Sequence, residues 1–303
     1  MSVQATAISW CDSVWNPIRG CSLVSSGCTN CYAMRQAGRF SGPGQPYEGL
    51  VRKNSQGFKW TGEVRLIEKD LDLPLHWKKP RRIFVNSMSD VWHGQVPDAW
   101  IDQIFAVMIL AEALEVGHVF QLLTKRPERM AAYFAAAPWP RISAIAKARW
   151  NWHWGAGSRW YPEKVWLGAS VENQATADER IPWLLQTPAA IRFVSYEPAL
   201  GPVDLRQYMP NALWNDLPSW KEPEVDWVVC GGESGPHARP CDLGWLRSII
   251  QQCGAADVAV FVKQLGARPW ITGLHVQPPV PAHIYSRTDT TGNHPSAYEI
   301  HGF

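Results

Sequence analysis

The chain has 303 residues, of which 46% are hydrophobic and 18% are charged, and its formal net charge is +2. This length allows one large domain or two small ones, and so small a net charge excludes a general electrostatic attraction to nucleic acids or membranes. No apolar run reaches the ~20 residues of a membrane helix, and residues 1–12 contain no secretory signal. We therefore expect a cytoplasmic protein without a membrane partner, whose seven cysteines are ligands, catalytic groups or core residues rather than disulfides.

Three cysteines lie close together near the N-terminus, within residues 11–34. Cys21, Cys28 and Cys31 have the spacing C-x6-C-x2-C, so one short loop brings three thiolates together. A [4Fe–4S] cluster takes four ligands, and with three cysteines one iron stays open to chelate a cofactor or substrate. Gly20 and Gly27 precede the first two cysteines and would let the backbone curl around the cluster.

Two other interpretations of this loop remain open. With Cys11 added, four thiolates would form the closed tetrahedral set of structural zinc, although Cys11 has no cysteine close to it in sequence. The three cysteines could also be unrelated core residues, but a loop of Gly, Ser and Asn has little to bury. Of the remaining cysteines, Cys230 and Cys253 are expected in the core, and Cys241 stays ambiguous.

Six short runs rich in Val, Ile and Phe follow along the chain, and each ends in polar residues. Such runs are typical of buried parallel strands, and helical patterns separate them. The strands are expected at residues 82–87, 119–124, 165–171, 191–196, 227–230 and 258–262, and helices at 100–114, which Asp98 could cap, 177–185 and 243–253. This alternation predicts an α/β fold with a parallel sheet.

Polar residues that gather after several strands are typical of the C-terminal face of a barrel, where barrel enzymes have their active site. We therefore predict a partial or complete (β/α) barrel over residues 1–267. An open doubly wound sheet is the second choice, because the sequence has no Gly-x-Gly-x-x-Gly fingerprint. Residues 131–164 and 206–224 are expected to be loop insertions, and residues 268–303 an irregular C-terminal tail.

The order of the motifs resembles that of the phage Gp37/Gp68-like family (DUF5131), which is grouped with radical S-adenosylmethionine (SAM) proteins. The resemblance covers about residues 8–266, and its motifs are Trp15-Asn16-Pro17, the cysteine loop with Tyr32-Ala33, Asn86–Asp90, Leu123–Pro127, Gly168–Asn173, Ser195–Pro198 and Gly231–Gly235. It implies a barrel of radical-SAM type that holds a [4Fe–4S] cluster on the three loop cysteines and binds S-adenosyl-L-methionine. The common radical-SAM loop has three residues, not six, between the first two cysteines.

The polar residues after the strands are the candidate site residues. Acidic groups suit the ammonium and ribose hydroxyls of SAM, and basic or amide groups suit its carboxylate. Gly231-Gly232-Glu233 resembles the Gly-Gly-Glu motif that contacts the SAM amino group, although it follows a late strand. The residues at the usual place of that motif, after the second strand, are Asn86, Ser87 and Asp90. The candidate cofactor contacts are thus Asn86, Ser87, Asp90, Glu172, Asn173, Gly231, Gly232 and Glu233, and the candidate catalytic residues are Lys125, Glu197 and Lys263.

Several of these residues also have a structural interpretation. Glu233 could be a solvated residue of a tight turn, and Lys125 with Arg126 could form a solvated helix start. Lys263 ends an apolar strand, where an unpaired charge would be costly, so its side chain is expected to point into a polar site.

These motifs predict an iron–sulfur enzyme of radical-SAM type, served by a reductant such as flavodoxin or ferredoxin. Its substrate is predicted to be a nucleic acid or nucleotide derivative, because Lys and Arg alternate with Trp over residues 147–166, and cations can neutralise phosphates while indoles stack on bases. The alternative for this segment is a lid whose Trp side chains pack on the barrel. Two other functions stay open: a zinc-binding nucleic-acid-binding protein without redox chemistry, and a barrel hydrolase with a structural metal.

Overall fold

The computed structural model describes residues 6, 8–55, 57–152, 162–210 and 224–271. Seven strands form a sheet in the order β1-β6-β7-β8-β9-β10-β12, and the pairs β1–β6, β6–β7, β9–β10 and β10–β12 are parallel. The order follows the chain from one edge to the other, as in a (β/α) barrel, whereas a doubly wound sheet reverses direction. The α/β class is therefore confirmed, and the sheet is consistent with a partial barrel.

The predicted elements correspond to observed ones. The sheet strands are β1 (Ser13–Trp15), β6 (Arg82–Val85), β7 (Val119–Thr124), β8 (Val165–Val171), β9 (Ile191–Tyr196), β10 (Trp227–Gly231) and β12 (Ala259–Gln264). The longer helices are α2 (Asp98–Ala113), α3 (Pro127–Ala135), α4 (Trp139–Trp150), α5 (Gln174–Leu185) and α6 (Leu243–Ala255). Six predicted strands and three predicted helices are thus confirmed to within a few residues, while β1 is an unpredicted edge strand.

The start of α2 differs from the prediction. Asp98 is the first helical residue rather than the cap, and the capping position belongs to Pro97, whose backbone is extended and which makes no side-chain cap. The Asp98 carboxylate instead accepts a hydrogen bond from Arg129 at 3.3 Å. A carboxylate in the first turn still interacts favourably with the helix dipole.

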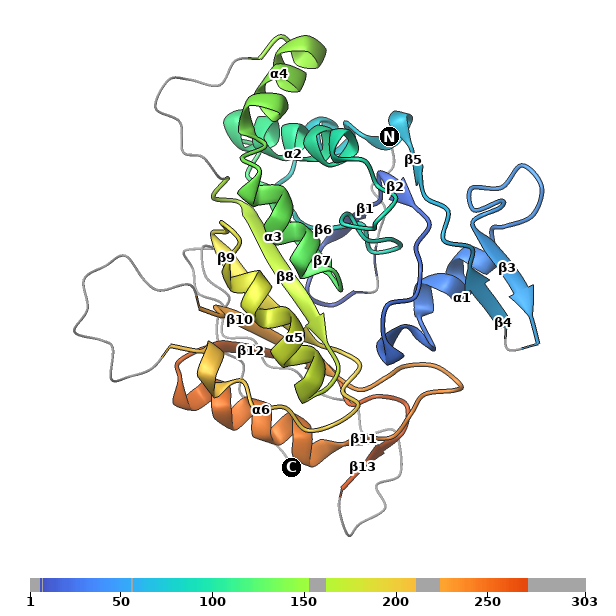
Figure 1. Ribbon diagram of the computed structural model, residues 1–303, viewed down its shortest axis with the longest axis vertical. Helices are drawn as coiled ribbons and strands as arrows, with labels where there is room; N and C mark the ends of the chain where they lie inside the picture. Colours follow the sequence, from blue (N-terminus) through green and yellow to red (C-terminus); the bar gives the residue numbers. More distant parts are fainter. Residues whose placement is uncertain (1–5, 7, 56, 153–161, 211–223, 272–303) are drawn as a thin grey trace. The chain divides into compact units, whose positions relative to one another are not determined.

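The chain divides into two compact units, and the boundary falls within β8. The first unit comprises Met1–Gly168 and Thr187–Ala190, and the second comprises Ala169–Gln186 and Ile191–Phe303. In the second unit, α6 packs on β10 and β12, and β11 (Cys241–Asp242) pairs with β13 (Pro269–Trp270) at the start of the predicted tail (Figure 1). No helix among the described residues is long and apolar enough to cross a membrane.

The first unit contains a small addition that the sequence analysis does not predict. It consists of α1 (Tyr32–Gly38) and a hairpin of β3 (Val51–Asn54) and β4 (Gly57–Trp60), which lie side by side in Figure 1. Short elements complete the unit: β2 (Ile18–Arg19), which pairs with β5 (Arg65–Leu66), and the 3₁₀ helices η1 (Ser26–Cys28), η2 (Glu68–Asp70) and η3 (Leu73–His76). A further 3₁₀ helix, η4 (Arg206–Tyr208), belongs to the second unit.

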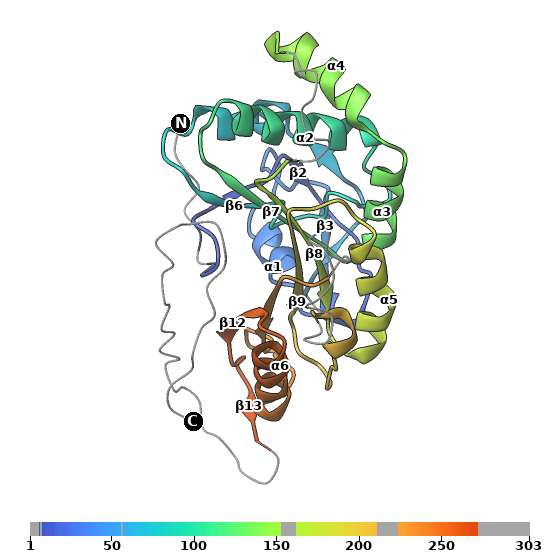
Figure 2. The same ribbon diagram turned by 90° about the vertical axis from the view of Figure 1, so that its left-hand side faces the viewer.

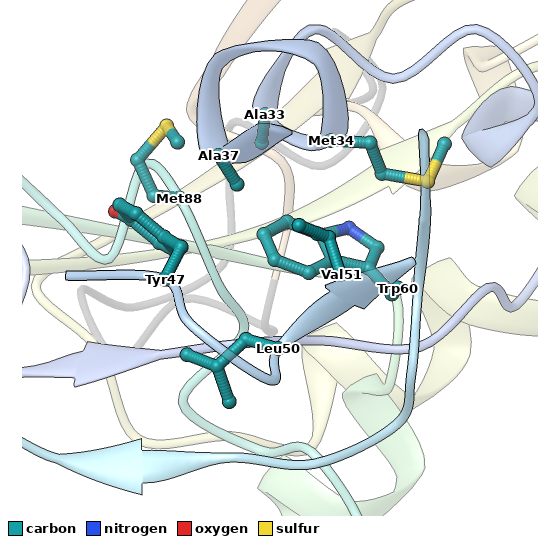
Figure 3. Packing of buried hydrophobic residues seen from close by; sticks show 8 residues of the cluster. All are labelled: Ala33, Met34, Ala37, Tyr47, Leu50, Val51, Trp60 and Met88. Atoms are coloured by element: carbon teal, nitrogen blue, oxygen red, sulfur yellow. The ribbon is translucent and has the colours of Figure 1, made fainter. Parts of the chain in front are cut away.

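An apolar cluster holds α1 against the hairpin. We call it the α1 cluster, and its buried members are Ala33, Met34, Ala37, Tyr47, Leu50, Val51, Trp60 and Met88 (Figure 3). Cys21, Cys31 and Phe58 pack against it. Burial of apolar surface stabilises the fold by about 25 cal/mol per Å². Because Cys21 and Cys31 pack against this cluster, it holds both ends of the cysteine loop in place.

The predicted insertion at residues 131–164 is partly helical. In Figures 1 and 2, α4 lies beside α2, and Arg141 pairs with the buried Asp102 of α2 at 2.8 Å. Arg149 donates to Glu68 at 3.0 Å and to Gln103 at 2.8 Å. Trp154, Arg159 and Trp160 lie outside the described residues, as do residues 211–223 and 272–303. α4 therefore packs on α2 within the first unit, and the lid alternative for residues 147–166 stays a prediction.

Gly20, just before the first loop cysteine, provides a test of backbone packing. Its φ is +92°, and a Cβ atom there would lie 2.1 Å from the carbonyl oxygen of Glu63, whereas Gly62 has a φ of +96° and no atom within 4 Å of such a Cβ. Gly27, by contrast, lies within η1, so the turn there is helical.

We expect Gly20→Ala to lower the free energy of unfolding more than Gly62→Ala. Both variants incur a backbone cost of roughly 1–2 kcal/mol, and overpacking against Glu63 adds about 1–3 kcal/mol in Gly20→Ala alone. Urea denaturation of the two variants measures the difference. Equal losses would show that the close approach at Gly20 does not exist.

Candidate functional site

The three loop cysteines lie in the first unit, between β2 and α1. Cys21 follows β2, Cys28 ends η1, and Cys31 is the capping residue of α1. Backbone hydrogen bonds tighten the turn, because Cys28 N donates to Ser25 O at 3.0 Å and Cys31 N donates to Cys28 O at 3.3 Å. All three thiols are free and half-buried. One loop thus carries three thiols, of which Cys28 and Cys31 are joined by a tight turn and Cys21 and Cys31 pack against the α1 cluster.

Burial disfavours the ionised form of these thiols, while nearby cations favour it. Burial raises the pKa of Cys21 to about 12, and the charge of Asp90 raises it too, whereas Arg126 lowers it. Burial also raises the pKa of Cys31, and Lys125 lowers it. Cations beside a thiol stabilise the thiolate that a metal binds. The loop therefore combines shielded thiols with two basic groups.

Asp90, which follows β6, is a buried acceptor with several donors. Its Oδ2 accepts from Arg126 Nη1 at 2.8 Å, and both carboxylate oxygens accept from Thr124 Oγ1, at 2.8 and 3.0 Å. The backbone N–H groups of Trp92 and Lys125 donate to it at 3.0 and 3.3 Å. The predicted solvated helix start is therefore wrong for Arg126, whose guanidinium is held in an ion pair.

The other edge of Arg126 reaches the cysteine loop. Its Nη2 donates to Ser22 O at 3.2 Å and to Ser22 Oγ at 2.9 Å, and Ser22 Oγ lies 2.8 Å from His93 Nε2. Gln95 N donates to His93 Nδ1 at 3.2 Å, so the neutral ring carries its proton on Nε2 and donates to Ser22. Burial lowers the pKa of His93 to about 4, which keeps the ring neutral. This network fixes the end of β7 to the residue after the first cysteine.

Asn86 and Ser87 connect the end of β6 to the same loop. Asn86 has a φ of 57°, and its Oδ1 accepts from Ile18 N at 3.4 Å. Its buried Nδ2 has no hydrogen-bond partner among the described residues. Ser87 Oγ donates to Asn16 Oδ1 at 3.2 Å, and Ser87 O accepts from Tyr32 O–H at 2.5 Å. Asn86 therefore carries a buried donor that a ligand or water could satisfy.

Glu197 and Lys263 form an ion pair in the second unit. Lys263 Nζ donates to the two Glu197 oxygens at 2.8 and 2.9 Å, and Gln264 Nε2 donates to Oε1 at 3.0 Å. The register between β10 and β12 shifts by one residue at Lys263. Such a bulge re-aims side chains, which explains how two consecutive residues reach one carboxylate. Lys263 is thus paired, as its position at the end of an apolar strand predicts.

The Gly-Gly-Glu motif also lies in the second unit. Glu233 is buried and pairs with Arg239, with Nη2–Oε1 at 2.6 Å and Nε–Oε2 at 3.0 Å, so the interpretation as a solvated turn residue is wrong. Gly231 ends β10, and a Cβ atom on Gly232 would lie 2.5 Å from Leu265 O. Close backbone packing therefore explains why position 232 is a glycine.

Glu172 and Asn173 lie between β8 and α5, and Asn173 caps the helix. The buried Glu172 carboxylate accepts from Arg180 Nη1, at 3.2 Å from its Oε2. Asn173 Oδ1 accepts from Thr176 N at 3.1 Å, and Thr176 Oγ1 accepts from Asn173 N at 3.1 Å, a capping box. Both residues have local structural partners, and their assignment to a cofactor stays a prediction.

The candidate residues thus fall into two sets, one in each unit. The first unit brings the loop cysteines together with Asn86, Ser87, Asp90 and Lys125, and the second brings together Glu197 and Lys263. Sequence analysis assigns no role to the partners that hold them, which are Asn16, Ser22, His93, Arg180, Arg239 and Gln264. Asn16, Ser22 and Gln264 carry a sequence signal, since Asn16 belongs to a predicted motif and the other two each stand next to a predicted site residue.

The family of the chain follows from a comparison with known families. A family model described as a protein of unknown function, DUF5131, matches residues 5–279. The chain belongs to the DUF5131 family. No curated protein and no solved structure matches the DUF5131 chain. The predicted membership in DUF5131 is therefore confirmed. The matched range contains the cysteine loop and every candidate site residue of this DUF5131 protein.

The donor set of the DUF5131 loop differs from that of a closed zinc site. Among the described residues, no three His, Cys, Asp or Glu side chains are grouped so that they could hold a metal ion. Cys11 donates to Ile8 O at 3.6 Å, and burial raises its pKa to about 11, with further effects from Phe84, Asp12, Thr6 and Arg82. The loop thiols, by contrast, act on one another, since Cys28 and Cys31 both raise the pKa of Cys21.

Proposed function

We propose that this protein is an iron–sulfur enzyme of radical-SAM type whose cluster is held by Cys21, Cys28 and Cys31. The observation that carries the proposal is the loop itself: three thiols in one short loop, near enough for Cys28 and Cys31 to shift the pKa of Cys21, with two basic groups beside them. In a [4Fe–4S] cluster each thiolate binds a different iron, so the ligands lie farther apart than those of a single zinc ion. We base the choice on the number of loop cysteines, because structural zinc takes four protein ligands, whereas three leave one iron of a cluster open.

When bound, such a cluster supplies an open iron that chelates SAM and an electron that cleaves it. The chain's own residues would position and balance it. Arg126, held by Asp90, fixes Ser22 next to Cys21, and Lys125 and Arg126 offset the negative charge that thiolates bring. The α1 cluster shields the thiols from water on one side.

The SAM contacts are proposed first in the same unit. Asn86 is the strongest candidate, because a buried donor without a partner costs about 1–3 kcal/mol unless a ligand or water accepts from Nδ2. Ser87 lies beside it. Asp90 would influence the site indirectly, through its ion pair with Arg126. The carboxylates of the second unit remain proposed SAM contacts on the basis of the family resemblance.

The substrate and the reductant belong to the same proposal. We propose a nucleic acid or nucleotide derivative as substrate, and a small electron carrier such as flavodoxin or ferredoxin as reductant, in the cytoplasm. The pairing of Arg149 with Glu68 and Gln103 weakens the case for residues 147–166 as the binding segment. The surface of α1, next to the cysteine loop, supports the same substrate class on other grounds.

Anaerobic reconstitution tests the proposal directly. We expect about four iron and four sulfide ions per chain, a brown colour, SAM binding by calorimetry, and release of 5′-deoxyadenosine after reduction. A colourless protein with about one zinc per chain would overturn it in favour of the zinc-binding alternative. A loaded cluster that does not bind SAM would leave an iron–sulfur protein without radical-SAM chemistry.

A further inference from the structure

The part of the first unit that surrounds the cysteine loop is basic. Residues 13–66 contain seven Arg and Lys residues against two Glu and no Asp, a surplus of five positive charges. The whole chain has a net charge of +2, so the rest of the chain is acidic by three charges. A local patch of this kind attracts anions even when the protein as a whole is nearly neutral.

Large apolar side chains are exposed in the same region. Seven such side chains are exposed among the described residues, and four of them, Leu23, Val24, Tyr32 and Phe40, lie in the cysteine loop, in α1 or directly after α1. Exposed apolar groups that gather in one place mark interaction sites. The region around the cysteine loop therefore combines positive charge with exposed rings.

The exposed face of α1 carries both positively charged and aromatic side chains. Tyr32, Arg35 and Arg39 have helical spacing and share this face, while the opposite face is buried in the α1 cluster (Figure 3). Phe40 follows the last of them. Tyr32 and Phe40 are each 44% exposed, and the Tyr32 hydroxyl donates a hydrogen bond to Ser87 O. We call these four residues the α1 surface.

In α1 and in the β3–β4 hairpin, side chains of like charge lie next to each other, whereas neighbouring positions usually favour opposite charges. Arg35 and Arg39 stand four residues apart on α1, and Arg52 lies directly opposite Lys59 in the hairpin. Like charges at such positions repel each other. Lys59 also donates to Thr29 O at 3.4 Å, which brings its positive charge to the cysteine loop. A polyanion would relieve the repulsion.

We propose that the α1 surface binds single-stranded nucleic acid. Arg35 and Arg39 would neutralise phosphates, and the rings of Tyr32 and Phe40 would stack on unpaired bases, which a duplex does not offer. Cations alone would suit any polyanion, but exposed rings in line with them favour bases. Since Tyr32 directly follows Cys31, the bound strand would lie beside the proposed cluster. The inference names the substrate class of the proposed function, and it rests on that function only in calling the strand a substrate.

Binding of labelled oligothymidylate and oligouridylate to the full-length chain tests the proposal. Strands of about 20 nucleotides exceed the ~4–16 nucleotides of typical sites, and fluorescence anisotropy between about 50 and 200 mM salt gives affinity and salt slope. We expect Arg35→Gln/Arg39→Gln to lower the slope of log affinity against log salt by about 1.4, or ~0.7 per lost phosphate contact. The control Lys78→Gln/Lys79→Gln removes two exposed lysines of the same unit and should leave the slope unchanged.

The rings have their own pair of variants. Tyr32→Ala/Phe40→Ala should weaken binding at constant salt by roughly 5- to 150-fold for each ring that is lost, the range expected for one stacked base, whereas Tyr32→Phe keeps the ring and should bind nearly as well. Circular dichroism and urea denaturation confirm that each variant is folded.

Three results would overturn the proposal. The first is no oligonucleotide binding at the lowest salt. The second is an equal loss of binding in the Lys78→Gln/Lys79→Gln control. The third is binding to phosphatidylserine vesicles but not to oligonucleotides, which would assign the surface to lipid. The measurement uses metal-free protein, so a failure to load iron would count against the proposed enzyme and not against this surface.

Discussion

Replacement of Cys21, Cys28 or Cys31 by Ala should abolish cluster binding, whereas Cys11→Ala should leave it intact. Each loop cysteine would be the sole protein ligand of one iron, so each substitution removes one of only three protein ligands of the cluster. Cys11 is the matched control because it is a buried free thiol of the same unit. Its pKa is shifted by burial and by its own neighbours, Phe84, Asp12, Thr6 and Arg82, rather than by the loop thiols.

Iron and sulfide per chain, with the visible absorbance of sulfur-to-iron charge transfer, measure the effect after anaerobic reconstitution. The three loop variants should retain almost no chromophore, and Cys11→Ala should retain nearly all of it. Unfolding curves of the metal-free variants separate loss of a ligand from loss of the fold. If Cys11→Ala loses the metal as completely as Cys28→Ala, the site has four cysteine ligands and no open iron.

The strands of the sheet could be predicted because their sequences are nearly continuous apolar runs. Residues 119–124, for example, read as a buried parallel strand and form β7. β1 has only three residues, Ser13–Trp15, and lies at the sheet edge, so it has no such run. The β3–β4 hairpin carries Arg52, Lys53 and Lys59, and its few apolar residues gain their meaning only from packing on α1.

The site could be predicted only in part, because its interacting residues lie far apart in the sequence. Polar residues directly after a strand are visible in the sequence, which is how Asp90 and Glu197 are found. Their partners are not visible, because Arg126 lies 104 residues from Ser22 and Lys263 lies 66 residues from Glu197. The one-residue register shift that re-aims Lys263 depends on strand pairing. Local pattern therefore locates the charged residues, and only the fold shows which charges neutralise each other.

Asp90→Ala should be the most destabilising change of a charged residue in the first unit. The side chains of Arg126 and Asp90 are 17% and 8% exposed, so removing the carboxylate leaves a shielded guanidinium, and the hydroxyl of Thr124, without their acceptor. Breaking a buried pair from one side costs about 3–5 kcal/mol. Asp12→Ala is the matched control, because Asp12 accepts from Arg82 in an ion pair whose side chains are 42% and 48% exposed, and exposed pairs contribute about 0–1 kcal/mol.

Urea denaturation of the metal-free protein measures both losses, and the double variant Asp90→Ala/Arg126→Met separates charge from packing. Because both charges are then gone, the double variant should be more stable than Asp90→Ala alone. Its cluster loading should nevertheless stay low, since the hydrogen bonds from Arg126 to Ser22 O and Oγ are lost with the guanidinium. Stability that recovers together with full loading would show that Arg126 does not position the cysteine loop. Equal losses in Asp12→Ala and Asp90→Ala would show that the Asp90 pair is not shielded.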